Sequence, residues 1–301
     1  MSDDNVIEID FDENEVPETL DTGVVVQTPE ESSEDTGGAD KILKIGVLGT
    51  NSIAKSIPIM FSSNPKTIKV TSYDNVDTAA EGAQRIYYIC LDAVFDKDDF
   101  DDSNIIDACL KLTKNSKATV VLKTTVPYNT IERILIGVNE LRFIYSPEEA
   151  SDDDLREIMR SSYNFVGGAS AATEAYAKLL AGASLFERTT VVSSALETSL
   201  VKTGIVGLKA ITQTFYNQLH DCVTELGGNY TFVKKIVTDI KTKSDLTIPT
   251  FMRAQNQDGI SYKKSRSFSG EFLNTDAKIL SSMTDKMPLL DECINYKNLK
   301  D

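Results

Sequence analysis

Short, mostly apolar segments alternate with helix-type segments between residues 41 and 194, and this alternation constrains the fold more than any other feature. Apolar strands separated by helices are typical of a parallel sheet that is buried on both faces. The expected strands span residues 44–48, 68–73, 85–91, 118–123, 141–145 and 163–167. The sequence therefore predicts an α/β domain with a parallel sheet and helices on both of its faces.

The character of the sequence changes after residue 190. Residues 195–226 carry apolar side chains at helical spacing, so we expect one long helix that the glycines at 227–228 end. A second helix is expected over 231–240, a loop over 255–267 and mostly helix over 270–300. These features divide the chain into an acidic tail (1–40), the α/β domain (41–194) and an all-helical domain (195–301).

The negative charge is concentrated in the tail. Residues 1–40 hold 14 of the 46 acidic residues and none of the 31 basic ones, so the remainder is nearly neutral. Such a chain offers no basic surface to nucleic acid and is repelled by anionic membranes. We expect a disordered tail that docks on a protein partner, with residues 6–11 adding a strand to that partner. The alternative is a solvated tail without a partner.

The cysteines stand alone in the sequence, at Cys90, Cys109, Cys222 and Cys293. Without paired spacing they predict free thiols of a reducing compartment, with neither a metal site nor disulfides. The sequence has no secretory signal and no apolar run long enough for a bilayer, so we expect a soluble cytoplasmic protein. His220, the single histidine, is expected to be packed or solvent-facing.

The turn after the first strand has the position of a dinucleotide fingerprint, whose ideal form is GxGxxG or GxGxxA. Gly49 and Ala54 fit its first and third positions, but Asn51 occupies the second, where a side chain crowds the pyrophosphate. Ser52 is a candidate N-cap of the helix that follows. Asp74 follows the second strand, where an acid can hold the ribose hydroxyls. We predict a Rossmann-like domain in which NAD binding is weak or lost.

Five segments resemble, in order, conserved segments of the UDP-glucose/GDP-mannose dehydrogenase family. They are the strand at 44–48 with its turn, KTTVPYNT at 123–130 (similar to KSTVPxGT), SPEEASD at 146–152 (similar to SPEFLRE), SLVK at 199–202 continuing to FYNQ at 215–218 (similar to ELxK and FINE), and FSGEFLNTD at 268–276 (similar to YGGxCLPKD). The resemblance implies a Rossmann domain followed by a helical dimerisation domain. It also implies NAD-dependent oxidation of a sugar C6 alcohol to the acid, through a cysteine thiolate.

Some catalytic positions of the family are retained. Thr125, Glu148, Lys202 and Asp276 match family residues, and Asp152 replaces a glutamate by a shorter acid. The resemblance also places Thr125 at the cofactor site. Three of these matches have a structural alternative: Thr125 as a strand-end hydroxyl, Lys202 as an exposed helix charge, and Asp276 as the N-cap of a helix over 277–286.

Other catalytic positions are lost. The family nucleophile corresponds to Phe272, which has no lone pair with which to attack a carbonyl carbon. The family asparagine after the helix lysine corresponds to Val206, the lysine before Asp276 corresponds to Thr275, and Glu271 adds an unfavourable negative charge. The chain also ends before the third domain of the family. It therefore resembles a truncated, catalytically degraded member.

Three hypotheses follow from this resemblance. The first is a pseudoenzyme that serves as a structural or interaction protein. In this hypothesis it forms a homodimer through the 195–226 helix and docks on a partner through its tail. An assembly such as a phage particle is one setting, which would place the protein in a virion. The second is an NAD-dependent dehydrogenase of a UDP- or GDP-sugar that carries out a single oxidation without a thiol. The third is a sensor that binds NAD without chemistry.

Overall fold

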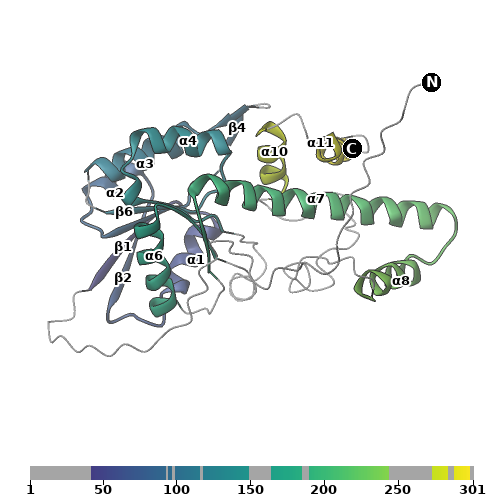
Figure 1. The fold of residues 1–301 in the computed structure, drawn as a ribbon, viewed down its shortest axis with the longest axis horizontal. Helices are drawn as coiled ribbons and strands as arrows, with labels where there is room; N and C mark the ends of the chain where they lie inside the picture. The colour runs from purple at the N-terminus through teal and green to yellow at the C-terminus, as the bar shows by residue number, and fades with distance from the viewer. Residues whose placement is uncertain are drawn as a thin grey trace, which may run out of the picture.

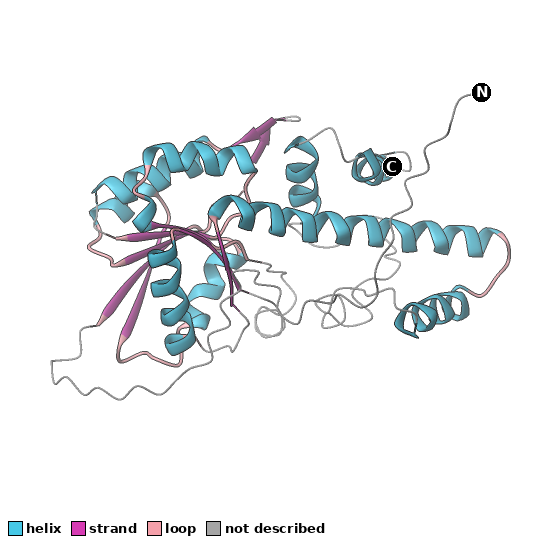
Figure 2. Cartoon of the chain, in the orientation of Figure 1, coloured by secondary structure: helices cyan, strands magenta, loops and turns pink. Residues whose placement is uncertain are grey.

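The computed structural model describes residues 42–92, 94–96, 99–115, 118–148, 164–184, 190–243, 273–283 and 288–298. A seven-stranded sheet, in the order β2-β1-β3-β6-β7-β8-β9, forms the body of the molecule (Figures 1 and 2). Its strands are β1 (Leu43–Leu48), β2 (Ile68–Tyr73), β3 (Ile86–Ile89), β6 (Thr119–Leu122), β7 (Phe143–Tyr145), β8 (Asn164–Gly168) and β9 (Thr190–Ser193). A separate hairpin pairs β4 (Val94–Asp96) with β5 (Asp99–Asp101).

Helices cover both faces of the sheet, as the sequence predicts. On one face lie α1 (Ser52–Met60) and α6 (Ser170–Ala183), whose apolar residues share a core with the sheet. The other face is covered by α2 (Val76–Glu81), α3 (Ser103–Asn115) and α4 (Tyr128–Gly137). A short 3-10 helix, η1 (Glu140–Arg142), leads into β7.

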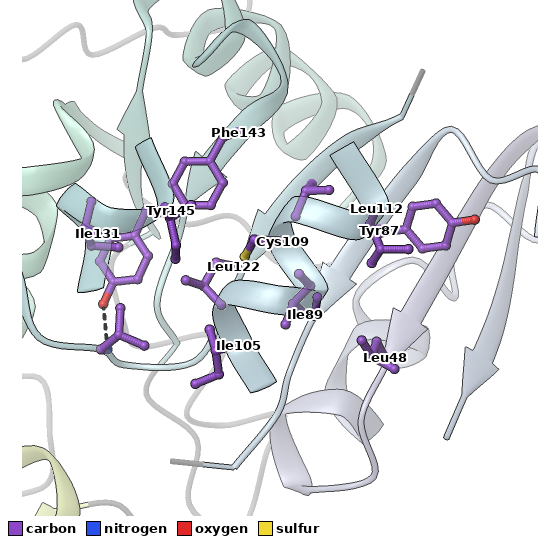
Figure 3. Packing of buried hydrophobic residues seen from close by; sticks show 14 of the residues in the cluster. Leu48, Tyr87, Ile89, Ile105, Cys109, Leu112, Leu122, Ile131, Phe143 and Tyr145 are labelled. Atoms are coloured by element: carbon purple, nitrogen blue, oxygen red, sulfur yellow. Dashed lines mark hydrogen bonds between the residues drawn. The ribbon is translucent and has the colours of Figure 1, made fainter. Parts of the chain in front are cut away.

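Residues of the central strands β1, β3, β6 and β7 enter both cores. In β3, Tyr88 packs on the α1 side, whereas Tyr87 and Ile89 pack on the α3 side, together with Leu122 and Tyr145 (Figure 3). Because side chains of a strand alternate between its faces, a run that is apolar at every position fits only a sheet buried on both sides. The α/β prediction is confirmed.

Two details of the sheet differ from the prediction. β8 runs antiparallel to β7, while all other neighbouring strands of the large sheet are parallel. β9 is an additional strand, since the last strand that the sequence predicts spans residues 163–167. The direction of β8 has a weak sequence signal, because a strand buried on both faces has the same apolar pattern in either direction. β9 has a weak signal because it is a short edge strand with half-buried side chains.

The long helix α7 (Ala195–Glu225) runs from the sheet past the body of the molecule (Figures 1 and 2). A capping box fixes its start, because the Ser194 side chain accepts from Glu197 N and the Glu197 carboxylate accepts from Ser194 N. Gly227, with φ +70°, lies just past its end, as predicted.

Three further helices accompany α7. They are α8 (Tyr230–Lys243), α10 (Leu273–Met283) and α11 (Pro288–Asn298). α8 folds back beside the far end of α7, where the half-buried His220 ring lies 4.8 Å from the Tyr230 ring, so this histidine is packed. Within the described residues, no helix combines the length and the hydropathy that a bilayer span requires.

Candidate functional site

The turn from β1 to α1 lies against the end of β3. Gly49 has φ +127°, and a Cβ atom at this position would lie 2.2 Å from the Cys90 carbonyl oxygen. The Gly49 N–H donates to Tyr73 O at 3.2 Å, which ties the turn to β2 as well. Only glycine combines this backbone conformation with such a close approach, so packing between strands explains the residue.

Asn51, and not Ser52, is the N-cap of α1. Asn51 Oδ1 accepts from Ala54 N at 3.0 Å, and Asn51 Nδ2 donates to Asp92 Oδ1 at 2.8 Å. The prediction of Ser52 as the cap is wrong, because Asn51 holds the extended backbone of an N-cap while Ser52 is already helical. Asp92, which has no predicted role, anchors this cap from the segment after β3.

The remaining cofactor candidates lie beside this turn. Ala54 is 4% exposed and packs in the core beneath α1. Asp74 directly follows β2 and is exposed at the carboxyl edge of the sheet, as expected of a ribose ligand. The positions are those that the sequence predicts, while their role in binding stays a prediction.

A buried ion pair lies at the same edge of the sheet, two strands further on. Lys123 follows β6, and its Nζ lies 3.1 Å from Glu148 Oε2, with each side chain 2% exposed. Lys123 Nζ also donates to Ser146 Oγ at 3.2 Å. Lys123 and Ser146 were not predicted as site residues. The sequence signal that could have identified them is a polar residue directly after an apolar strand, because parallel strands end at the same edge of the sheet.

Thr125 lies in a loop that is held from three sides. Its neighbour Thr124 donates through Oγ1 to Leu91 O at 2.6 Å, and Val126 N donates to the Tyr145 hydroxyl at 3.2 Å, the dashed bond in Figure 3. Thr125 itself is 7% exposed. The loop therefore bridges the ends of β3 and β7.

α7 brings its lysine to this loop. Ser199 Oγ donates to Val126 O at 3.1 Å, and Lys202 lies about one helical turn further along α7. Lys202 is only 2% exposed, so its interpretation as an exposed helix charge is wrong. Thr125, Glu148 and Lys202 thus lie in adjoining loops and helices at the carboxyl edge of the sheet.

The environment of α7 becomes apolar one turn beyond Lys202. Val206, which the sequence resemblance aligns with a family asparagine, is 2% exposed and belongs to a small core between α7, α10 and α11. The other buried members of this core are Ala210, Ala277, Leu280, Leu290 and Cys293. Gly207 lets α10 approach, because a Cβ there would lie 2.6 Å from Leu280 Cδ2.

No protein-family model and no curated protein matches the sequence. Solved structures do match. A UDP-glucose dehydrogenase from Pyrobaculum islandicum superposes with a TM-score of 0.66 at 11% identity, covering 88% of this chain and 70% of that chain. The UDP-D-ManNAc dehydrogenase from Pyrococcus horikoshii gives 0.66 at 16% identity, with 85% and 68% covered. An NDP-N-acetyl-D-galactosaminuronic acid dehydrogenase from Methanosarcina mazei gives 0.57 at 16% identity, with 86% and 66% covered.

The chain has the fold of the nucleotide-sugar dehydrogenases. The similarity covers most of the chain, as the ordered segments predict. At this identity it establishes the fold alone, and the chain spans only about two thirds of the length of the matched proteins.

The thiols of this dehydrogenase-like fold are mostly buried. Burial raises the pKa of Cys90, at the end of β3, to about 12, and it also raises the pKa of Cys109 and of Cys293. A buried thiol that keeps its proton is a poor nucleophile. Cys222 is exposed, but it lies near the far end of α7.

Three predicted positions remain to be placed. Asp276 is the fourth residue of α10, which begins at Leu273, so its assignment as an N-cap of a helix over 277–286 is wrong. Asp152 and Phe272 lie outside the described residues. The structure therefore brings together part of the predicted set and leaves the nucleophile position to the sequence comparison.

Proposed function

We propose that this chain is a pseudoenzyme built on the dehydrogenase fold, and that it works as a structural or interaction protein in the form of a homodimer through α7. The observation that carries the proposal is an apolar stripe on the outer face of this helix. Val201, Leu208 and Phe215 are spaced seven residues apart, and their side chains are 42%, 37% and 50% exposed.

The stripe has the geometry of a helix–helix contact. A seven-residue repeat keeps apolar side chains on one side of a helix over several turns, and an identical stripe on a second copy is a self-complementary partner for it. α7 is about 46 Å long and runs out beyond the sheet (Figure 1), and the exposed side chains of the stripe give a second chain a surface to pack on. Fully burying an exposed side chain of this kind contributes about 1.5–3 kcal/mol, and burying what remains exposed of these half-buried side chains contributes roughly half of that.

The loss of catalysis is supported by several residues. The family nucleophile corresponds to Phe272, and Val206 replaces an oxyanion donor with a side chain in an apolar core. The cysteine nearest the β1–α1 turn, Cys90, is held as a neutral thiol. The acidic residues 1–40 serve, in this proposal, to dock the dimer on a protein partner within a larger assembly such as a phage particle.

Sedimentation velocity tests the dimer. We expect the wild-type chain to sediment as a dimer at micromolar concentration and Phe215→Asp to sediment as a monomer. The matched control is Ile136→Asp, which places the same charge on an 87% exposed apolar residue of α4 and should remain a dimer. A monomeric wild type, or a dimeric Phe215→Asp, would overturn the dimer.

A spectrophotometric assay of NADH formation with UDP- and GDP-sugars tests the loss of catalysis. We expect no turnover above the background, and sustained turnover would overturn the pseudoenzyme proposal. One observation favours the second candidate, an NAD-dependent dehydrogenase with single-step chemistry. Lys123 and Glu148 form a buried ion pair at the edge where such a site would lie, and Lys202 is also buried, with Asp276 as a further candidate. Oxidation of a sugar alcohol only as far as the aldehyde would select that candidate.

A further inference from the structure

The three positions of a dinucleotide fingerprint have different physical tasks. The first residue makes the tight turn, the second lets the backbone approach the pyrophosphate, and the third lets the helix pack closely on the strand. The pyrophosphate then lies at the N-terminus of the helix, where free N–H groups receive it.

The two packing tasks are fulfilled. A Cβ atom at Gly49 would lie 2.2 Å from the Cys90 carbonyl oxygen. The missing side chain therefore lets the turn approach the end of β3. Ala54 is buried between α1 and the sheet. Neither residue needs a bound cofactor to account for it, because the fold itself requires both.

The position that serves the cofactor is occupied by the chain's own side chain. Asn51 Oδ1 accepts from Ala54 N at 3.0 Å and so takes an N–H group of the first turn that a phosphate oxygen would otherwise use. The Asn51 carboxamide is held in place by Asp92, which accepts from Nδ2 at 2.8 Å. We refer to this pair, Asn51 and Asp92, as the clasp.

Charge at the clasp acts in the same direction. The Asp92 carboxylate is exposed at the mouth of the turn, where a pyrophosphate would bring two more negative charges. Ser52 is 7% exposed and its Oγ is buried without a hydrogen-bond partner, so this hydroxyl presents little surface to a phosphate at the turn.

We propose that the clasp closes the β1–α1 turn to dinucleotides, so that the residues present do not fit the pyrophosphate of NAD. The Asn51 carboxamide stands where the phosphate would accept hydrogen bonds, and Asp92 keeps it there. The chain thus retains the glycine and alanine that build the fold and has replaced the residue that admits the cofactor. This inference is independent of the dimer interface.

Calorimetric titration with NAD+ tests the clasp. We expect the full-length wild type to show no saturable binding, corresponding to a dissociation constant above about 1 mM. Asn51→Gly should bind at least about tenfold more tightly, because it frees the Ala54 N–H and removes the side chain. Asp92→Ala, a change at an exposed residue that keeps the helix cap, should give a smaller gain, and the double variant should give the largest.

Asn75→Gly is the matched control. Asn75 caps α2 in the same way, accepting from Thr78 N at 2.9 Å, so its loss reproduces the cost of losing a cap without opening the β1–α1 turn. This variant should bind NAD+ no better than the wild type. Micromolar binding by the wild type, or no gain in Asn51→Gly and in Asp92→Ala, would overturn the proposal. A gain in Asn75→Gly equal to that in Asn51→Gly would also overturn it.

Discussion

The carboxyl edge of the sheet and the outer face of α7 use their side chains in opposite ways. At the sheet edge, charged and polar groups are satisfied by one another, Lys123 by Glu148 and Asn51 by Asp92. On α7, apolar side chains such as Phe215 remain exposed. A ligand site usually offers polar groups, and a surface helix usually buries its apolar face. The contrast supports the proposal that this chain interacts through the helix and not through the sheet edge.

The strongest test of this contrast is removal of one partner of the buried ion pair. Glu148→Ala leaves the Lys123 ammonium buried without its carboxylate, so the free energy of unfolding should fall by about 3–5 kcal/mol in urea titrations. Removing both charges, as Lys123→Met with Glu148→Leu, should recover most of this loss. A loss below about 1 kcal/mol in the single variant is the expected behaviour of an exposed pair and would mean that the sheet edge is open to water.

Much of the fold could be predicted because buried strands have a direct sequence signal. β1, β2, β3, β6 and β7 each lie within a short segment rich in apolar residues that predicts a strand, and α7 follows from its helical spacing. The direction of β8 could not be predicted, because the residues of a strand that is apolar on both faces form the same pattern whichever way the strand runs.

The site was harder to predict because its geometry depends on distant contacts. Lys202 is an ordinary surface residue by sequence, and it is buried because α7 packs on a loop near Val126, to which Ser199 is hydrogen-bonded across 73 residues. The choice between Asn51 and Ser52 as the cap also needed the backbone, since both residue types are good N-caps.

Alkaline pH provides a second test of the closed sheet edge. Burial raises the pKa of Cys90 to about 12, whereas an unfolded thiol titrates near pH 9. The folded state therefore holds a proton that the unfolded state loses, so this contribution to stability is complete below pH 9 and is lost as pH rises towards 12. The slope should be about 1.4 kcal/mol per pH unit for each such thiol, and Cys109, whose pKa is also raised by burial, adds a second.

Urea titrations at several pH values between 9 and 10.5 measure this slope. Cys90→Ala should reduce the slope by about 1.4 kcal/mol per pH unit, which corresponds to one proton. Groups that titrate in both proteins cancel when the slope of the variant is subtracted from that of the wild type. Equal slopes in the variant and the wild type would show that solvent reaches Cys90, and the sheet edge would then be open in the region of the β1–α1 turn.

The smallest expected effect distinguishes the two faces of α7 itself. A Cβ added at Gly204 has open space around it, whereas one at Gly207 would lie 2.6 Å from Leu280 Cδ2. Alanine favours a helix over glycine by about 0.8–1 kcal/mol, so Gly204→Ala should gain about that much stability. Gly207→Ala should lack this gain, and its free energy of unfolding should fall about 1 kcal/mol below that of the parent chain, because Leu280 must move within a packed core.

Both variants are best compared by urea unfolding of the monomer, with Phe215→Asp as the common background, so that dimer formation does not contribute. Equal gains from Gly204→Ala and Gly207→Ala would mean that α10 does not pack on α7 in solution. Val206 would then lie outside an apolar core, and the inner face of α7 would be open to a polar ligand beside Lys202. That result would remove one structural support for the proposed loss of catalysis while leaving the apolar stripe on the opposite face unaffected.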